Sequence, residues 1–197
     1  MFRRLRLQFI MIASLAILFI LVFTVGIINT VRSFQTEQEI SKVLNTLTEN
    51  NGSFGKTKKI ETNQGREIPS DSFRFFSVTL SDDKIVSQDT SHTSLINDEE
   101  AARYALTVSR LTNNLGTIRE KNINLSYQVS KVSKDKILVV FLDTTSYYNS
   151  SQALLSLSIL LSLFGFIFFV VIVSALSGIV IRPFIRNYEK QRRFITN

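Results

Sequence analysis

The sequence predicts an α+β protein in which two transmembrane helices flank a small domain made of a long helix, an antiparallel sheet and a short helix. Two long uncharged runs near the ends of the 197-residue chain predict the membrane helices. Between them, apolar residues recur at helical spacing in some segments and at alternating spacing in others. The charges are divided in the same way: the net charge of +7 lies on the two end segments, because residues 32–151 hold 15 basic and 15 acidic side chains.

The first apolar run, Phe9 to Ile28, and the second, Leu154 to Ile181, both reach the roughly 20 residues that a helix needs to cross the hydrocarbon core. We assign transmembrane helices to residues 9–31 and 151–181, since the rest of the chain could not bury two such runs in a core. The charged start resembles a signal peptide. However, the apolar run is longer than the ~7–15 residues typical of that class and no small-x-small cleavage site follows it. An uncleaved signal anchor is therefore expected.

Basic residues at both ends predict the orientation. Three arginines precede the first run, and five basic residues with a single acid, Glu189, follow the second. The positive-inside rule then places residues 1–8 and 182–197 in the cytoplasm and residues 32–150 on the other side of the membrane. Because the excess positive charge belongs to membrane flanks, it does not indicate a nucleic-acid partner.

The outer segment begins with a helix that should continue directly from the first membrane span, because neither Gly nor Pro interrupts residues 31–49. Its apolar face is formed by Ile40, Val43, Leu44 and Leu47, and Asn50 to Ser53 should end it. The elements expected after it are a loop at 56–71, a hairpin of strands 73–80 and 85–89 with a turn at 81–84, a helix beginning after Asn97, and a second hairpin of strands 124–132 and 137–142 with a turn at 133–136.

The short helix carries the clearest local signals. Asn97 is the expected N-cap and Glu100 the third residue of a capping box. Its apolar face is predicted to hold Ala101, Ala105, Val108 and Leu111, and Gly116 is predicted to end it. The continuous apolar strand 137–142 is expected at the centre of the sheet, with both helices on one face. This order resembles extracytoplasmic PAS-like sensor domains, and the resemblance covers residues 32–148.

No catalytic, cofactor-binding or metal-binding constellation is visible in the chain. It has no cysteine, no phosphate-binding glycine loop and a single histidine, His92. Asp89 lies close to His92 in sequence, so this loop is a candidate ligand-sensing element, although a solvated loop histidine is the plainer interpretation. Small residues punctuate the second span, which favours helix association in a homodimer or simply reflects their frequency in such helices.

The last residues suggest a family. "YEKQRRFITN" resembles the segment directly before the H-E-L-K-T-P phosphoacceptor box of bacterial sensor histidine kinases, with matches at Glu189, Lys190, Gln191, Phe194, Ile195 and Asn197. The preceding Arg182-Pro183 is similar to the start of the linker in that family. The resemblance implies a homodimeric sensor that passes an unidentified extracellular stimulus to an autokinase domain. That domain would use ATP and Mg²⁺ and would phosphorylate a response regulator.

The resemblance also identifies candidate signal-coupling residues: Pro183, where the helix should kink or restart, and Glu189, Phe194 and Ile195. Because so few residues separate Pro183 from Glu189, the membrane helix should connect almost directly to the kinase helix. Tyr147 and Tyr148 would link the outer domain to the second span. The alternatives are a two-span accessory protein that binds a partner through its outer domain, and the sensor half of a chemoreceptor or cyclase. An extracytoplasmic enzyme has the least support.

Overall fold

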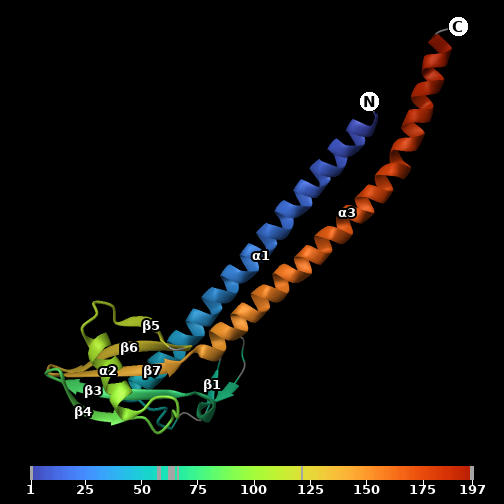
Figure 1. Cartoon of the computed structure of the whole chain (residues 1–197). Helices are drawn as coiled ribbons and strands as arrows, with labels where there is room; N and C mark the ends of the chain where they lie inside the picture. Colours follow the sequence, from blue (N-terminus) through green and yellow to red (C-terminus); the bar gives the residue numbers. More distant parts are fainter. Residues whose placement is uncertain (1, 57–58, 62–64, 66, 121, 196–197) are drawn as a thin grey trace. The chain divides into compact units, whose positions relative to one another are not determined.

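The computed structural model describes residues 2–56, 59–61, 65, 67–120 and 122–195, and divides the chain into two compact units. One unit contains the chain up to Val31 and from Ala153 onward, and the other is Arg32–Gln152. The elements, labelled in Figure 1, are α1 (Phe2–Glu49), β1 (Lys59–Glu61), β2 (Glu67–Pro69), a 3-10 turn (Ser70–Ser72), β3 (Phe75–Ser81), β4 (Lys84–Asp89), α2 (Asp98–Ser109), β5 (Leu115–Glu120), β6 (Ile123–Ser133), β7 (Lys136–Asp143) and α3 (Thr145–Ile195).

The described parts of the first unit are α1 up to Val31 and α3 from Ala153 onward, which belong to two long apolar helices. Each is long and apolar enough to cross a membrane, over Arg6–Glu49 and Thr145–Ser177. Inside this unit the Arg6 guanidinium donates a hydrogen bond of 2.8 Å to the Ser174 carbonyl, which ties the two helices together. Ser177 is buried at 2% exposure, so one of the small residues in the second run lies in a shielded position.

The second unit is built on a five-stranded antiparallel sheet with the strand order β4-β3-β7-β6-β5. The predicted central position of β7 is confirmed, since it pairs with β3 on one side and β6 on the other. The β3–β4 turn is also as predicted. Asp82 and Asp83 both adopt positive φ angles, 48° and 59°, as a two-residue type I′ hairpin turn requires.

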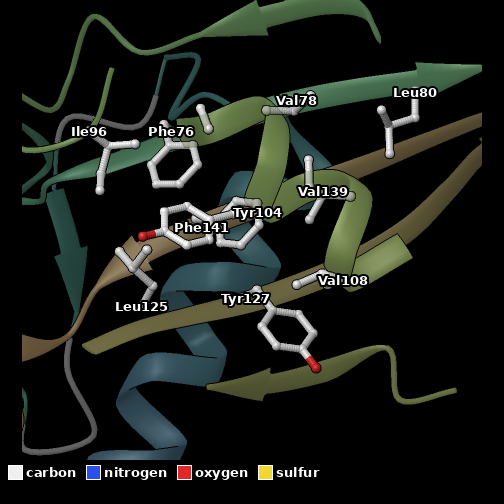
Figure 2. Packing of buried hydrophobic residues seen from close by; sticks show 12 residues of the cluster. Phe76, Val78, Leu80, Ile96, Tyr104, Val108, Leu125, Tyr127, Val139 and Phe141 are labelled. Carbon is white, nitrogen blue, oxygen red and sulfur yellow. The ribbon is translucent and has the colours of Figure 1, made fainter. Parts of the chain in front are cut away.

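The helices cover opposite faces of this sheet, so the prediction that both lie on one face is wrong. On one face α2 packs over a cluster that includes Phe76, Tyr104 and Phe141, shown in Figure 2. On the opposite face, the segment of α1 from Ile40 to Leu47 packs over a second cluster that includes Leu138 and Val140. The reason is that β7 is apolar on both sides, and β3 adds Phe75 on the α1 side to its apolar row on the α2 side, so these strands need cover on both faces.

The long helix α1 ends where predicted, in a Schellman motif. The Gly52 N–H donates to the Leu47 carbonyl at 2.7 Å, and the Asn51 N–H donates to the Thr48 carbonyl at 3.3 Å. Asn51 takes the left-handed position with φ of 56°, and Gly52 follows with φ of 86°. A side chain at Gly52 would collide with Ser77, because its Cβ would lie 2.4 Å from the Ser77 hydroxyl oxygen.

The capping box of α2 is confirmed. Asn97 accepts a hydrogen bond from the Glu100 N–H at 2.8 Å, and the Glu100 carboxylate accepts one from the Asn97 N–H. The predicted end of this helix is wrong, because α2 stops at Ser109 and Leu111 is half-exposed. Gly116 instead lies in β5, opposite Tyr127 of β6, where a Cβ would sit 2.5 Å from the phenol oxygen. This glycine makes room for the Tyr127 ring rather than ending a helix.

Two further elements were not predicted. The segment 56–71, expected as a loop, contains the short antiparallel pair β1–β2. The edge strand β5 was likewise not expected, so the second hairpin is part of a three-stranded meander β5–β6–β7. Both are edge elements with alternating or mostly exposed residues, which give little hydrophobic signal in the sequence.

Candidate functional site

The loop between β4 and α2 holds the two residues proposed for sensing, Asp89 and His92. The His92 imidazole is solvent-exposed and stacks on the buried ring of Phe75, with centroids 4.4 Å apart and planes 16° from parallel. It thus completes a row of rings that continues through Phe75 and Phe54 to Phe73. The packing role is an adequate explanation for the histidine.

The Asp89 carboxylate is occupied within the loop itself. It accepts hydrogen bonds from the Ser91 hydroxyl at 2.6 Å and from the Ser91 N–H at 3.0 Å. These bonds to the charged form are the main reason that the pKa of Asp89 lies below its ordinary value, and the nearby charge of His92 adds a smaller effect in the same direction. The carboxylate therefore stays ionised and shapes the turn. Among the residues that the structure describes, no group of three or more His, Cys, Asp or Glu side chains could hold a metal ion.

A more developed site lies at the junction between the sheet and α3, where the unit Arg32–Gln152 leads into the second apolar helix. Thr144, the residue before α3, is fully buried, and its backbone and side chain both donate to the Asn124 carbonyl, at 2.8 and 3.0 Å. The next residue, Thr145, accepts a hydrogen bond from the Asn124 N–H through its hydroxyl at 2.9 Å. The first residues of α3 are therefore fastened to the start of β6.

The hydroxyl groups at this junction form a chain with a fixed direction. The Thr144 hydroxyl gives its single proton to the Asn124 carbonyl, so the Ser126 hydroxyl, 3.1 Å away, must donate to Thr144. The Thr117 hydroxyl, 3.1 Å from Ser126, must in turn donate to Ser126. This hydroxyl relay (Thr117, Ser126, Thr144) connects edge strand β5 through β6 to the beginning of α3, and each donor in it has one acceptor.

Two more contacts hold the same junction. The Asp143 carboxylate accepts from the Thr145 N–H at 2.9 Å and so satisfies one free donor of the first turn of α3. The Asn124 side-chain oxygen accepts from the Arg119 guanidinium at 2.8 Å. Sequence reasoning named Tyr147 and Tyr148 here, and the structure adds partly buried contacts of both rings with the α1-side core. It missed the relay, although the polar alternation Asn124, Ser126, Gln128 was a signal that one face of β6 is not simple core.

The proposed signal-coupling residues Pro183, Glu189, Phe194 and Ile195 all lie on α3, which is a single helix from Thr145 to Ile195. Their side chains are outside the described part. The sequence predicted that the helix would kink or restart at Pro183. It does not restart there, because α3 continues through this residue. Asp89 and His92 belong to the other compact unit, Arg32–Gln152.

Comparison with known proteins gives no family assignment. No family model matches the chain, and no curated protein matches it significantly.

Proposed function

We propose that this chain is the sensory and transmembrane signalling portion of a bacterial two-component sensor histidine kinase. In this proposal residues 32–150 form a PAS-like domain outside the cell membrane, both ends of the chain are cytoplasmic, and the protein acts as a homodimer. The observation that carries the proposal is the continuity of α3, which leads from the sheet junction through the apolar run to the segment similar to the one before a phosphoacceptor box. The packing of α1 on the central strands supports the PAS-like interpretation.

The proposed mechanism depends on how α1 and α3 are attached to the sheet. The first turn of α3 is held by β6 through Asn124 and by its own cap, Asp143. The segment of α1 from Ile40 to Leu47 contacts the sheet mainly through apolar side chains of the second cluster, and the Gln128 side-chain amide of β6 adds a hydrogen bond of 2.7 Å to the Asn45 side-chain oxygen. A stimulus that shifts the sheet relative to α1 would therefore move α3 with the sheet. The autokinase domain, using ATP and Mg²⁺, would respond to that displacement and then phosphorylate a response regulator.

The first test is to read the encoding gene beyond codon 197, where a box similar to H-E-L-K-T-P is expected within a few codons. A stop codon there would contradict the proposal and favour an accessory membrane protein that binds a partner through its outer domain. The second test measures ATP-dependent autophosphorylation of the full-length protein in membrane vesicles, with phosphate transfer to a response regulator.

Insertions between Pro183 and Glu189 test the coupling itself. One added residue rotates the following helix by about 100°, whereas seven added residues return it to within about 20° of its original face. We expect the one-residue insertion to change the autophosphorylation rate strongly and the seven-residue insertion to preserve most of the response. Unchanged activity in both variants would show that the helix is not a direct coupler.

A further inference from the structure

A cavity of about 200 Å³ lies inside the outer unit, between the outer part of α1, the β5–β6 edge and the first turn of α3. Its polar lining consists of Glu37 and Ser41 from α1, Thr117 and Ser126 from the sheet, and Tyr148 from α3. It is separate from the Asp89–His92 loop, since neither residue contributes to the lining.

The cavity arises from a change of character across one face of the sheet. Ile40 and Leu44 of α1 belong to the apolar core over β7. Glu37 and Ser41 lie one helical turn apart on α1 and form one wall of the cavity. The facing wall is formed by β5 and β6, where Thr117 and Ser126 lie directly opposite each other. Small side chains on both walls leave a space that larger residues would fill.

The chemistry of the walls selects a ligand class. Among the lining residues, all of which the structure describes, Glu37 is the single charged group, and it is solvent-exposed, which places it at the mouth. The hydroxyls of Thr117 and Ser126 give their protons within the relay, so they can only accept from a ligand, whereas the Ser41 hydroxyl and the Tyr148 phenol can donate or accept. Ile40, Leu44 and Leu115 supply apolar contact. An anion would meet a carboxylate with no compensating cation in the lining, whereas a cation would be paired.

We propose that this cavity binds a small organic amine, with its ammonium group paired to the Glu37 carboxylate, a short aliphatic body against Ile40 and Leu44, and a polar end bonded to the hydroxyl groups of Thr117 and Ser126. The volume lies below the roughly 300–1,000 Å³ of sites for drug-sized ligands, so a compact molecule is favoured. The class is an amine with one further hydrogen-bonding group.

The position of the cavity gives such a ligand a role in signalling, a step that depends on the proposed function. Its walls include α1 and the first turn of α3, the two segments through which the outer unit joins the apolar helices. Ser126 also belongs to the hydroxyl relay that ends at Thr144. An amine would therefore contact, at one site, both helices and the relay that fastens one of them.

The test uses the full chain in nanodiscs of zwitterionic lipid, which has no net charge. The protein is titrated with 4-aminobutanol, 1,4-butanediol and 4-hydroxybutanoate. These probes share one length and differ in having a cationic, neutral or anionic end. Binding is measured by calorimetry and by the ¹⁹F resonance of fluorotyrosine at Tyr148, assigned with Tyr148→Phe. We expect 4-aminobutanol to bind about two- to fivefold more tightly than the other two, because only its ammonium group can pair with Glu37 and water screens this exposed ion pair. Equal binding of the amine and the diol would overturn the proposal.

Matched variants locate the site. Glu37→Gln keeps the shape and removes the charge, and should weaken amine binding by about two- to fivefold. Glu49→Gln removes a carboxylate from the same helix outside the cavity and should leave it unchanged. Ser41→Leu should fill the space and abolish binding, with the unliganded ¹⁹F spectrum checking that the variant is folded. If Glu37→Gln has no effect, or Glu49→Gln is equally harmful, the site is wrong.

The two proposals fail in distinguishable ways. Amine binding is measured on this chain and needs no kinase activity. Binding without any downstream phosphoacceptor box would leave the cavity assignment standing and remove the kinase proposal. Kinase activity in the full-length protein without binding of any of the three probes would leave the kinase proposal standing and remove the cavity assignment.

Discussion

The two faces of the sheet are built differently. The α2 face is apolar from strand to strand, with Phe76, Leu125, Tyr127 and Phe141 under the helix (Figure 2). The α1 face is divided: β3 and β7 contribute apolar side chains, whereas β5 and β6 contribute the hydroxyl relay and the cavity. The comparison teaches that one face of a small domain is uniformly apolar, whereas the other combines an apolar core with a polar edge. The uniform face holds the sheet together, and the divided face receives the two helices that lead away from it.

The largest expected effect comes from the uniform face. Replacing Phe141 with Ala removes a fully buried ring that stacks on Phe76 with centroids 4.5 Å apart. It should lower the free energy of unfolding by about 3–5 kcal/mol. Hydrogen exchange of the β7 amides in the full chain measures this loss. Leu111→Ala, at a half-exposed position beyond the end of α2, is the control and should cost under about 0.5 kcal/mol. Similar losses in both variants would contradict the described end of α2.

A smaller effect is expected where the divided face is polar. Thr144→Val keeps the shape but removes the acceptor of Ser126 and the donor to Asn124, so it should cost about 1–3 kcal/mol by the same measurement. Adding Ser126→Ala to this variant removes the stranded hydroxyl, so the double variant should lose less than the sum of the single losses. Strict additivity would show that the two hydroxyls are not coupled.

The helix caps offer a third comparison. Asn97→Ala removes the cap of α2 and should cost about 1 kcal/mol, observed as faster amide exchange in the first turn of that helix. Asp143→Ala removes the carboxylate that accepts from Thr145 and should act on the first turn of α3 instead. Loss of protection in the helix whose cap is intact would contradict these local assignments.

The smallest effect concerns Asp89. Its pKa lies below the ordinary value of 3.8 because Ser91 bonds to the carboxylate, so this group stabilises the fold above that value and the contribution is lost as pH falls through the lower, folded-state pKa. Ser91→Ala should raise the pKa of Asp89 toward 3.8, as followed by NMR titration of the carboxyl carbon. His92→Gln should raise it less, since Ser91 is the larger cause. The opposite order would mean that the histidine dominates the loop.

Much of the fold could be predicted from local signals. The capping box at Asn97, the end of α1 after Glu49 and the central apolar strand β7 all depend on residues close together in the sequence. The assignment of helices to faces could not be made in that way, because an apolar run such as Ile137 to Leu142 does not reveal that both sides of the strand are covered. The end of α2 was missed because Gly116 was interpreted by its backbone freedom, whereas its role is space for Tyr127.

The candidate site was predicted less well than the fold. His92 and Asp89 were predicted as site residues because of their distinctive chemistry. In the structure His92 has a packing role and Asp89 forms a turn. The hydroxyl relay consists of serine and threonine, whose roles depend on a partner from another strand. Thr117, Ser126 and Thr144 are far apart in the chain and meet only through strand register. The polar alternation of β6 shows which residues to examine, but not what they contact.

The central place of β7 has a consequence for the order of folding. This strand comes last in the sheet along the chain, yet it lies between β3 and β6. The β3–β4 and β5–β6 hairpins can therefore join only after β7 has formed and Leu142 has paired with Phe75. Contacts this distant in sequence close slowly. Because α3 begins two residues after β7, the sheet can close only when the second apolar helix is emerging during synthesis. Closure of the sheet and emergence of α3 would therefore be nearly simultaneous events, and a chain stalled before β7 would leave the β3 and β6 edges that pair with it exposed.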